Sequence, residues 1–461
     1  MKLAILGSGP GGYVAAVKAA QLGARVTVIE ENLVGGTCLN WGCIPTKILA
    51  SSSENFSRAK RLQEFGIDIT GEIALNFAKI LERKDTIVGL QAKGIRNLFK
   101  AHGIAFTEGR GQILSPSEIS VTPRNNTRET VPADRIILAT GSRPYELQGF
   151  PFDGTHILST DDVFRLDAIP KSLAIIGAGV SGCEFACIFR QLGSEVTLLE
   201  KLPRALASED TGISDLFERE LRKMGIRLLA NISIDSVDLQ DGSIRILLAG
   251  GREIIAEKAL VSAGRSLNSK GIGTESVGIE KGPSGEITVN DKMETNIPGI
   301  YAVGDVTGRH LLAHVASAEG IVAAKNCTGV DERIDYSAVP SAIFTSPEIA
   351  SVGIREQQAA ERGIKVRTGH FQFRTLAKSH IIGEIDGMVK IISDETSDKV
   401  LGVHIIGPHA SDLIHEAVLA ISAGLRTKDL SRMMHAHPTL SEVLQEAAAD
   451  VHGEAIHTIR K

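Results

Sequence analysis

Two cysteines separated by four residues are the first feature of the chain that could carry out chemistry. They are Cys38 and Cys43, in the segment Gly-Gly-Thr-Cys-Leu-Asn-Trp-Gly-Cys-Ile-Pro-Thr-Lys that spans residues 35–47. Pro45 is typical of the first turn of a helix, so Cys43 is expected near a helix N-terminus with Lys47 one turn later on the same face. Both features stabilise a thiolate, which predicts that Cys43 is the resting thiolate and Cys38 the more accessible partner.

The cysteine pair is open to three interpretations. A redox centre requires two thiols close to a dinucleotide site, whereas a structural role requires only that both thiols are buried. A zinc site would need two further Cys or His ligands at suitable spacing, and the nearby sequence offers none. The redox interpretation is favoured and no metal is predicted. The other three cysteines are interpreted as packing residues: Cys183, Cys187 and Cys327.

A second reactive segment, His-Ala-His-Pro-Thr-Leu-Ser-Glu, spans residues 435–442. Histidine exchanges a proton near neutral pH, so it can carry the proton of a thiol. The stretch from Thr439 to Glu442 also fits a capping box, which would tie Glu442 to the helix that follows. Both interpretations stay open, because one carboxylate has enough oxygens to serve a histidine and a helix N-terminus.

Two copies of one strand–turn–helix–strand unit are expected to position these groups. Residues 3–30 and 173–200 are identical at thirteen of 28 positions, with a constant offset of 170. In each copy an apolar strand leads into Gly-x-Gly-x-x-Gly, a helix follows, and a second apolar strand ends on an acid. The motif residues are Gly7, Gly9, Gly12 and Glu30 in the first copy, and Gly177, Gly179, Gly182 and Glu200 in the second.

Both copies predict dinucleotide sites. The glycines permit a tight turn, backbone approach to a pyrophosphate and close helix packing, and the free N–H groups of a helix N-terminus favour the phosphates. The terminal carboxylate can bind ribose hydroxyls and would repel a 2′-phosphate, so each site is expected to take FAD or NAD rather than NADP. The alternative is a pair of glycine-rich turns in an ordinary parallel sheet.

Length and composition exclude several other function classes. The chain has 461 residues, which suggests about three domains. Its 50 Lys and Arg residues against 55 Asp and Glu residues give a formal charge of −5, without the basic excess that nucleic acid requires. No apolar stretch reaches the ~18 residues of a membrane span, and no targeting segment is visible. Because five cysteines are a sparse, odd set typical of a reducing compartment, a soluble, cytoplasmic protein is expected.

The segment 35–47 and the two glycine motifs together resemble those of the pyridine nucleotide-disulfide oxidoreductases, flavoproteins that pass electrons between NAD(P), FAD and a protein disulfide. The resemblance covers nearly the whole chain. It implies an α/β fold with two doubly wound, Rossmann-like nucleotide-binding domains and a C-terminal α+β dimerisation domain. The implied domains are 1–143 (FAD-binding, first part), 144–268 (NAD-binding), 269–338 (FAD-binding or central, second part) and 339–461 (dimerisation, or interface).

The resemblance also assigns the cofactors and the residues that hold them. FAD is expected in the first glycine motif and NAD in the second. Asp305 would bind the flavin ribitol, the alternative being a buried acid that caps the next helix. The further FAD-binding positions are Lys47, Gly111, Thr140, Gly141, Ser142, Asp305 and Ala313, and the further NAD-binding position is Gly264, followed by Arg265.

Catalytic roles follow from the same match. His437 would be the base, oriented by Glu442, whereas His435 is expected to pack or to be solvated. Lys47 and Glu184 would pair beside the flavin, unless Glu184 is a solvated helix residue. The family forms homodimers through the C-terminal domain, which lends its histidine to the neighbouring subunit, so a monomer would lack a complete site. The catalytic residues implied are Cys38, Cys43, Lys47, Glu184, His437 and Glu442.

Details of the sequence favour the members of this family that oxidise dihydrolipoamide with NAD through a Cys38–Cys43 disulfide. The segment 435–442, the Cys-Leu-Asn segment and Glu200 are most similar to those enzymes, whose partners are the lipoyl domains of 2-oxo acid dehydrogenase or glycine cleavage complexes. Alternatives are an NAD(P)H-dependent reductase of another low-molecular-weight disulfide and a flavin-containing scaffold or redox sensor. The departures from the favoured enzymes are Trp41, Ser181, Cys183 and the stretch Thr375–Lys378.

Overall fold

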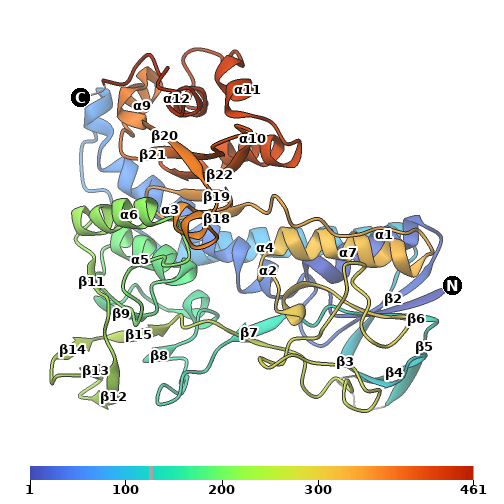
Figure 1. Cartoon of the computed structure of the whole chain (residues 1–461). Helices are drawn as coiled ribbons and strands as arrows, with labels where there is room; N and C mark the ends of the chain where they lie inside the picture. Colours follow the sequence, from blue (N-terminus) through green and yellow to red (C-terminus); the bar gives the residue numbers. More distant parts are fainter. Residues whose placement is uncertain (124–127, 460–461) are drawn as a thin grey trace.

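The first body of the protein is built on a seven-stranded sheet. A computed structural model describes residues 1–123 and 128–459. The strands of this sheet are β1 (Lys2–Leu6), β2 (Arg25–Glu30), β3 (Ala105–Ser115), β4 (Glu118–Pro123), β5 (Glu129–Pro132), β6 (Arg135–Leu138) and β17 (Ile300–Ala302). Their order is β17-β6-β1-β2-β3-β4-β5 (Figure 1). The first five in this order pair in parallel, and β4 and β5 extend the sheet as antiparallel strands.

Helices cover this sheet, which is why its central strands are continuous apolar runs. All but the first residue of β1 and of β6 are buried, as expected for a parallel sheet with two covered faces. The helices α1 (Pro10–Gln21) and α7 (Ala313–Cys327) pack against each other. Gly320 permits their close approach, because a Cβ atom at this position would overlap with the carbonyl oxygen of Gly11.

The second body repeats the architecture on a smaller scale. Its parallel strands are β8 (Ile157–Leu158), β9 (Ser172–Ile176), β10 (Glu195–Leu199), β11 (Arg227–Leu229) and β15 (Lys258–Val261), in the order β11-β10-β9-β15-β8. Its helices are η2 (Asp162–Arg165), α5 (Val180–Leu192) and α6 (Thr211–Lys223). An antiparallel sheet is attached, formed by β12 (Ile234–Gln240), β13 (Ser243–Leu248) and β14 (Glu253–Ala256). Two antiparallel strands, β7 (Ser142–Pro144) and β16 (Arg265–Leu267), connect the two bodies.

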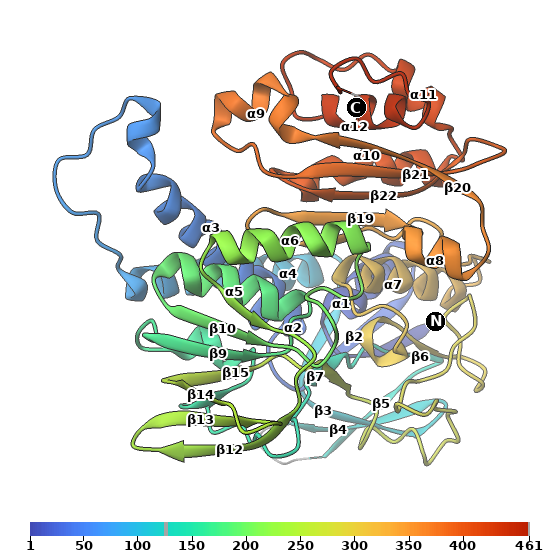
Figure 2. The ribbon, with the colours of Figure 1, turned by 60° about the vertical axis from the view of Figure 1, so that its left-hand side comes forward.

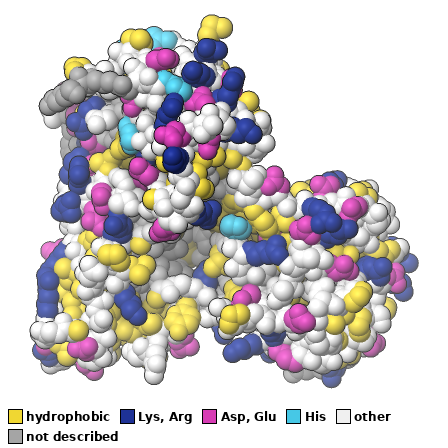
Figure 3. Space-filling view, in the orientation of Figure 1, with side chains coloured by type: hydrophobic (Ala, Val, Ile, Leu, Met, Phe, Trp, Pro, Cys, Tyr) yellow, Lys and Arg dark blue, Asp and Glu magenta, His cyan; other side chains and the backbone are white. Residues whose placement is uncertain are grey.

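The third body is an α+β unit formed by the C-terminal part of the chain. Its antiparallel sheet has the order β18-β19-β22-β21-β20, with β18 (Ser341–Ile343), β19 (Ile349–Gly353), β20 (Val366–Gln372), β21 (Met388–Asp394) and β22 (Val400–Ile406). Its helices are α8 (Glu356–Glu361), η4 (Phe373–Thr375), α9 (Ala377–Ile382), α10 (Ala410–Ser422), α11 (Thr427–Arg432) and α12 (Glu442–Asp450). In the view of Figure 1 this body stands above the second body while the first body extends to the right, which leaves an open corner above α7 (Figures 1 and 3).

The segment that carries the cysteines connects the bodies. It consists of α2 (Gly36–Asn40), α3 (Cys43–Ala59), η1 (Leu62–Phe65) and α4 (Phe77–Ala101). Helix α3 packs against α5 of the second body, and its far end projects toward the C-terminal body (Figure 2). None of the helices within residues 1–123 and 128–459 combines the length and the apolar composition of a membrane-spanning segment.

The predicted fold class is confirmed by these three bodies. Strand β17 comes after the second body in the chain but completes the first sheet, so one nucleotide-binding fold is interrupted by the other. The boundaries 1–143, 144–268, 269–338 and 339–461 remain predictions.

Candidate active site

The first glycine turn lies between β1 and α1. A different structural reason accounts for the glycine at each of its three positions. Gly7 has a φ of +97°, and a Cβ atom there would overlap with the carbonyl oxygen of Ala139. A Cβ atom at Gly12 would overlap with the carbonyl oxygen of Gly7. At Gly9, the N-cap of α1, the nearest atom would be 3.9 Å away, so packing does not explain this glycine. The open space above the helix N-terminus fits the approach of a pyrophosphate.

The second glycine turn, between β9 and α5, has the same three properties. Gly177 has a φ of +101°, and a Cβ atom there would overlap with the carbonyl oxygen of Ser262. A Cβ atom at Gly182 would overlap with Gly177, whereas one at Gly179 would meet no atom within 4 Å. Neither α1 nor α5 has an acidic residue in its first turn. The residues of both turns therefore fit the phosphates of a dinucleotide.

The carboxylates at the ends of the second strands hold these turns in place. Glu30 accepts hydrogen bonds from the backbone N–H and hydroxyl of Ser8, both at 2.8 Å, and from the N–H of Asn32 at 2.8 Å. Glu200 accepts from the N–H groups of Ala178 at 2.6 Å and Leu202 at 2.7 Å. The sequence predicts only a ribose-binding role for these acids. Carboxylate oxygens have lone pairs enough for both tasks.

The two cysteines lie on consecutive helices. Cys38 is in α2 and Cys43 is the first residue of α3. Gly42 separates the helices, and a Cβ atom there would be 3.1 Å from the carbonyl oxygen of Thr37 and 3.3 Å from the Cα of Cys38. A larger residue would therefore push the two helices, and the thiols that they carry, apart. Both thiols are half-buried and free.

The two thiols have opposite electrostatic environments. The hydrogen bond with Cys43, together with burial, holds the pKa of Cys38 well above its ordinary range. The same hydrogen bond stabilises the Cys43 thiolate, and against the opposing effect of burial it and the charge of Lys47 lower the pKa of Cys43 to about 7. Cys43 is thus the readily ionised member of the pair, and a thiolate is the form that reacts.

Lys47 forms a partly buried ion pair with Glu184 beside the cysteines. The Lys47 Nζ lies 2.9 and 3.0 Å from the two carboxylate oxygens of Glu184, whose side chain is 3% exposed. Glu184 also accepts from the backbone N–H of Phe344 at 2.9 Å, and Lys47 Nζ lies 4.5 Å from the centre of the Phe344 ring. The alternative that Glu184 is a solvated helix residue is therefore wrong. Phe344 follows β18 and had no predicted role, because nothing local indicates that it reaches α3 and α5.

Asp305 lies in η3 (Gly304–Thr307) and is joined to the segment that links the two nucleotide-binding bodies. The Ser142 hydroxyl donates to its carboxylate, and Arg265 lies 3.7 Å from it. Arg265 also donates to the hydroxyl and carbonyl of Ser142, at 2.6 and 2.9 Å. The side chain of Arg265 thus points toward the predicted FAD-binding residues, not only to the NAD side suggested by its neighbour Gly264.

A buried glutamate missed by the sequence analysis positions this turn. Glu319 of α7 is fully buried and accepts a 2.6 Å hydrogen bond from the backbone N–H of Gly304 and another 2.6 Å bond from the Tyr336 hydroxyl. Among the described residues, Asp305 has no hydrogen bond to the start of α7. The alternative that its carboxylate caps the next helix is therefore wrong.

The remaining predicted cofactor positions surround the same region. Thr140 exchanges hydrogen bonds with Asn268, at 2.8 and 3.0 Å. Gly141 and Gly264 have φ values of +69° and +114°, and a Cβ atom at either would meet nothing within 4 Å. Gly111 lies in β3, close to Leu6 of β1, and Ala313 is the first residue of α7.

His437 is paired with Glu442 at the start of α12. The His437 Nδ1 lies 2.8 Å from one carboxylate oxygen, and the other accepts from the Thr439 N–H at 2.8 Å. Helix α12 begins at Glu442 with Ser441 as its N-cap, so the predicted capping box is present only as the bond from Thr439. The His437 side chain is 71% exposed. Within the described part of the chain, no hydrogen bond joins it to either thiol.

His435 is not solvated. Its side chain is 3% exposed, and Nε2 lies 3.2 Å from a carboxylate oxygen of Glu416 while Nδ1 lies 3.1 Å from the carbonyl oxygen of Met433. His435 therefore packs inside the C-terminal body, and His437 is the exposed histidine of the segment.

Comparisons with known proteins agree with this arrangement. The "Pyridine nucleotide-disulphide oxidoreductase" family matches residues 1–320, and its dimerisation domain matches residues 339–448. A dihydrolipoyl dehydrogenase of Chlamydia muridarum is 43% identical over 446 residues, 96% of this chain and 95% of the relative. One of Bacillus subtilis is 41% identical, over 98% of each chain.

A solved structure has the same fold over nearly its whole length. The crystal structure of LpdA from Mycobacterium tuberculosis superposes with a TM-score of 0.92 at 30% identity, covering 97% of this chain and 99% of that one. The sequence matches extend over both nucleotide-binding bodies and the C-terminal body, and they show that the chain belongs to the pyridine nucleotide-disulphide oxidoreductase family.

Proposed function

We propose that the protein is a dihydrolipoyl dehydrogenase, which oxidises protein-bound dihydrolipoamide to lipoamide and reduces NAD. The observation that carries the proposal is the cysteine pair: Cys43 at the start of α3 has a pKa of about 7 and lies beside Lys47, whose partner Glu184 comes from the second nucleotide-binding body. The relatives from Chlamydia muridarum and Bacillus subtilis, both named dihydrolipoyl dehydrogenase, support the same activity.

The two glycine turns divide the cofactors between them. The first turn, with Glu30, Thr140, Gly141, Ser142, Asp305, Ala313, Gly111 and Lys47, would hold FAD. The second turn, with Glu200 and Gly264, would hold NAD. The chemistry that bound FAD would supply is the relay of an electron pair. The pair would come from the two reduced cysteines and would reach the nicotinamide as a hydride. Glu200 favours NAD because its carboxylate would repel the 2′-phosphate of NADP.

The protein side chains move the protons and sulfur bonds. His437 of the partner subunit takes the proton of one substrate thiol, and the resulting thiolate attacks Cys38 Sγ of the oxidised pair. The Cys38–Cys43 bond breaks and Cys43 leaves as a thiolate, stabilised by the helix start and Lys47. The second substrate thiol then attacks the sulfur bonded to Cys38, which closes lipoamide and releases the Cys38 thiol with a proton. This half-reaction thus leaves two electrons on the cysteine pair.

Glu442 and Glu184 are proposed to set the geometry of these steps. Because Glu442 lies on Nδ1 of His437, the other ring nitrogen, Nε2, is left to face a thiol. Glu184 fixes the ammonium group of Lys47, so that its positive charge stays close to Cys43.

A homodimer is proposed to complete the site. The match to the dimerisation domain and the exposed His437, which has no bond to the thiols of its own chain, support a histidine lent to the neighbouring subunit. The open corner beside the C-terminal body leaves room for a second copy (Figure 3). The lipoyl domains of 2-oxo acid dehydrogenase or glycine cleavage complexes would bring the substrate. A cytoplasmic location fits the sparse, odd set of cysteines.

A comparison of substrates tests the proposal. Purified protein is assayed with dihydrolipoamide and NAD or NADP, and in the reverse direction with glutathione and coenzyme A disulfides under NADH or NADPH. We expect turnover of dihydrolipoamide with NAD, and loss of that turnover in Cys38→Ser, with FAD still bound. Preferential reduction of another disulfide would favour the alternative reductase, and full activity in Cys38→Ser would reject the mechanism.

A further inference from the structure

We propose that the buried ion pair between Asp210 and Lys390 is a positioning device for the second glycine turn, which it anchors to the C-terminal body. Asp210 is the N-cap of α6 in the second body, and Lys390 lies in β21 of the C-terminal sheet. The inference rests on the proposed function in one respect, namely that the second turn binds NAD.

Among the ion pairs of the described residues that join two bodies, this one is the most deeply buried. The Lys390 Nζ lies 2.9 and 3.0 Å from the two carboxylate oxygens of Asp210, and the side chains are 5% and 0% exposed. Asp210 also accepts from the N–H groups of Gly212 at 3.0 Å, within its own helix, and of Glu356 at 3.2 Å, from the C-terminal body. The carboxylate is therefore bound from both sides of the boundary between the bodies.

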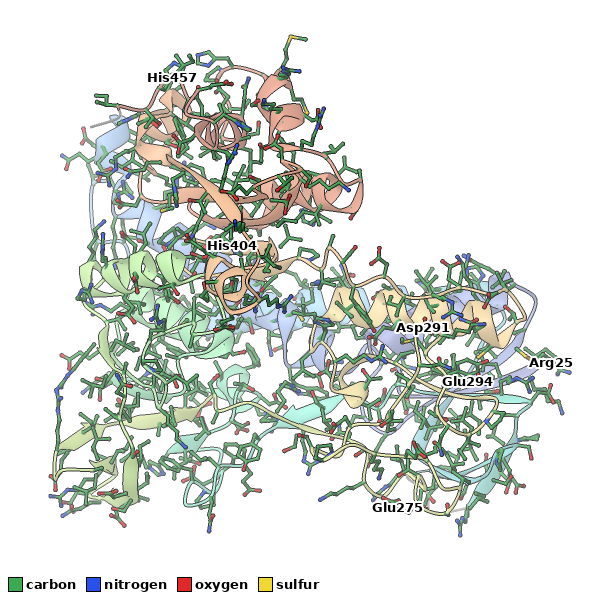
Figure 4. The ribbon with its side chains drawn as sticks, viewed as in Figure 1. Arg25, Glu275, Asp291, Glu294, His404 and His457 are labelled. Atoms are coloured by element: carbon green, nitrogen blue, oxygen red, sulfur yellow. The ribbon has the colours of Figure 1, made fainter. Side chains whose placement is uncertain are left out.

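The neighbouring Glu209 makes a second set of contacts across the same boundary. Its carboxylate accepts from the Ser351 hydroxyl at 2.7 Å and lies 3.5 Å from Arg355, and its carbonyl accepts from the Gln357 side chain at 2.8 Å. His404 lies at this boundary (Figure 4) and is 1% exposed. Polar groups thus join the start of α6 to the C-terminal sheet, beside an apolar cluster that includes Ile213 of α6 and Ile349 and Ile406 of the sheet.

A short chain of backbone hydrogen bonds connects the start of α6 to the glycine turn. The N–H of Glu209 donates to the carbonyl of Leu206 at 2.8 Å, and the N–H of Leu206 donates to the carbonyl of Ala178 at 2.8 Å. Ala178 stands between Gly177 and Gly179, and its own N–H is held by Glu200. The Ser214 hydroxyl of α6 donates to the carbonyl of Leu206 at 2.8 Å. A displacement of the start of α6 would therefore move the turn itself.

Stability alone does not account for this arrangement. A buried ion pair loses much of its attraction to desolvation, and a well-packed apolar pair at the same place is often as stable or more stable. In some proteins a buried polar contact instead restricts the parts that it joins to a single arrangement. Here a fixed arrangement of α6 and the C-terminal sheet would hold the second glycine turn, and with it the proposed NAD site, in place.

Asp386 provides a matched control. It pairs with Lys223 at the other end of α6, at 3.0 Å, so it joins the same two bodies, but both of these side chains are about half exposed. Asp210→Asn and Asp386→Asn thus make the same chemical change at a buried and at an exposed contact of one helix. A third variant, Asp210→Leu/Lys390→Met, replaces both members of the buried pair with apolar residues. It keeps the inference testable if the Asp210→Asn protein does not fold.

The experiment compares NAD binding, kinetics and hydrogen exchange in the FAD-loaded proteins. We expect Asp210→Asn and the double variant to raise the KM for NAD about tenfold while the KM for dihydrolipoamide changes less than about twofold. The amides of Ala178 and Leu206 should exchange faster in both, and Asp386→Asn should match the wild type. The double variant should melt somewhat below the wild type, because Asp210→Leu also removes the N-cap of α6 and the acceptor of the Glu356 N–H.

The inference fails if the double variant, or a folded Asp210→Asn protein, binds NAD and exchanges these amides as the wild type does. It also fails if Asp386→Asn has the same effect as Asp210→Asn. Failure of the proposed function would look different: the wild type would itself show no NAD binding, and this would overturn the inference along with the function.

Discussion

The reactivity of Cys43 depends on neighbours that belong to different segments of the chain. The Cys38 thiol donates to its sulfur, the ammonium of Lys47 lies one turn along α3, and the helix begins at Cys43 itself. Together they outweigh burial and bring its pKa to about 7. Cys43 in the reduced protein is therefore a thiolate above that pH and a thiol below it.

Alkylation of the reduced protein measures this charge. The rate of modification of Cys43 by iodoacetamide, followed by mass spectrometry, should rise with pH and reach half its maximum near pH 7. In Cys38→Ala and in Lys47→Met the midpoint should move to higher pH, because each change removes a group that stabilises the thiolate. A midpoint near the ordinary thiol value of roughly 8.5 in the wild type would contradict the electrostatic account.

At the same scale, the sequence predicts those parts of the site that depend on local spacing. Cys43 and Lys47 belong to one helix, so their relation follows from four residues of separation. The partner of Lys47 required the resemblance to a family, because Glu184 lies 137 positions away. Phe344 and Glu319 escaped prediction, since their roles arise only when separate segments pack together.

At the scale of elements, each glycine turn combines two residues required by packing with one that leaves space open. Gly182→Ala should destabilise the protein, because its Cβ would overlap with the backbone of Gly177. Gly179→Ala should fold, at a cost of ~1 kcal/mol for the less favourable N-cap, but should weaken NAD binding strongly. Thermal unfolding and NAD titration separate the two effects.

Gly9→Ala is the equivalent change in the first turn and serves as the control. It should lower FAD retention and leave the affinity of the second turn for NAD unchanged. If Gly179→Ala bound NAD as tightly as the wild type, the phosphates would not lie against this turn.

Element boundaries were harder to predict than element types. The repeated pattern predicts both strand–turn–helix–strand units, because each is encoded within a stretch of 28 residues. The capping-box alternative, which rests on the spacing of Thr439 and Glu442, would start α12 too early. In the structure Glu442 gives one oxygen to His437, and Ser441 is the N-cap.

At the scale of the whole molecule, hybrid dimers test whether the site is shared. Cys43→Ser and His437→Gln subunits, each inactive alone, are mixed in equal amounts and refolded together with FAD. If His437 acts in the neighbouring subunit, each hybrid has one complete site, and the mixture should recover about a quarter of the wild-type activity. If the histidine served its own chain, every dimer would stay inactive.

Glu200 holds the second glycine turn through hydrogen bonds and is also the residue proposed to select NAD over NADP. This combination limits how the coenzyme preference of the protein could be redesigned. Replacing the acid with a small or basic residue, so as to admit an extra phosphate, would also leave the amides of Ala178 and Leu202 without their acceptor. The second glycine turn, which is proposed to hold the NAD diphosphate, would then lose hydrogen bonds through the same substitution that admits the extra phosphate. A switch from NAD to NADP therefore has to supply a substitute acceptor for these two amides as well as remove the charge.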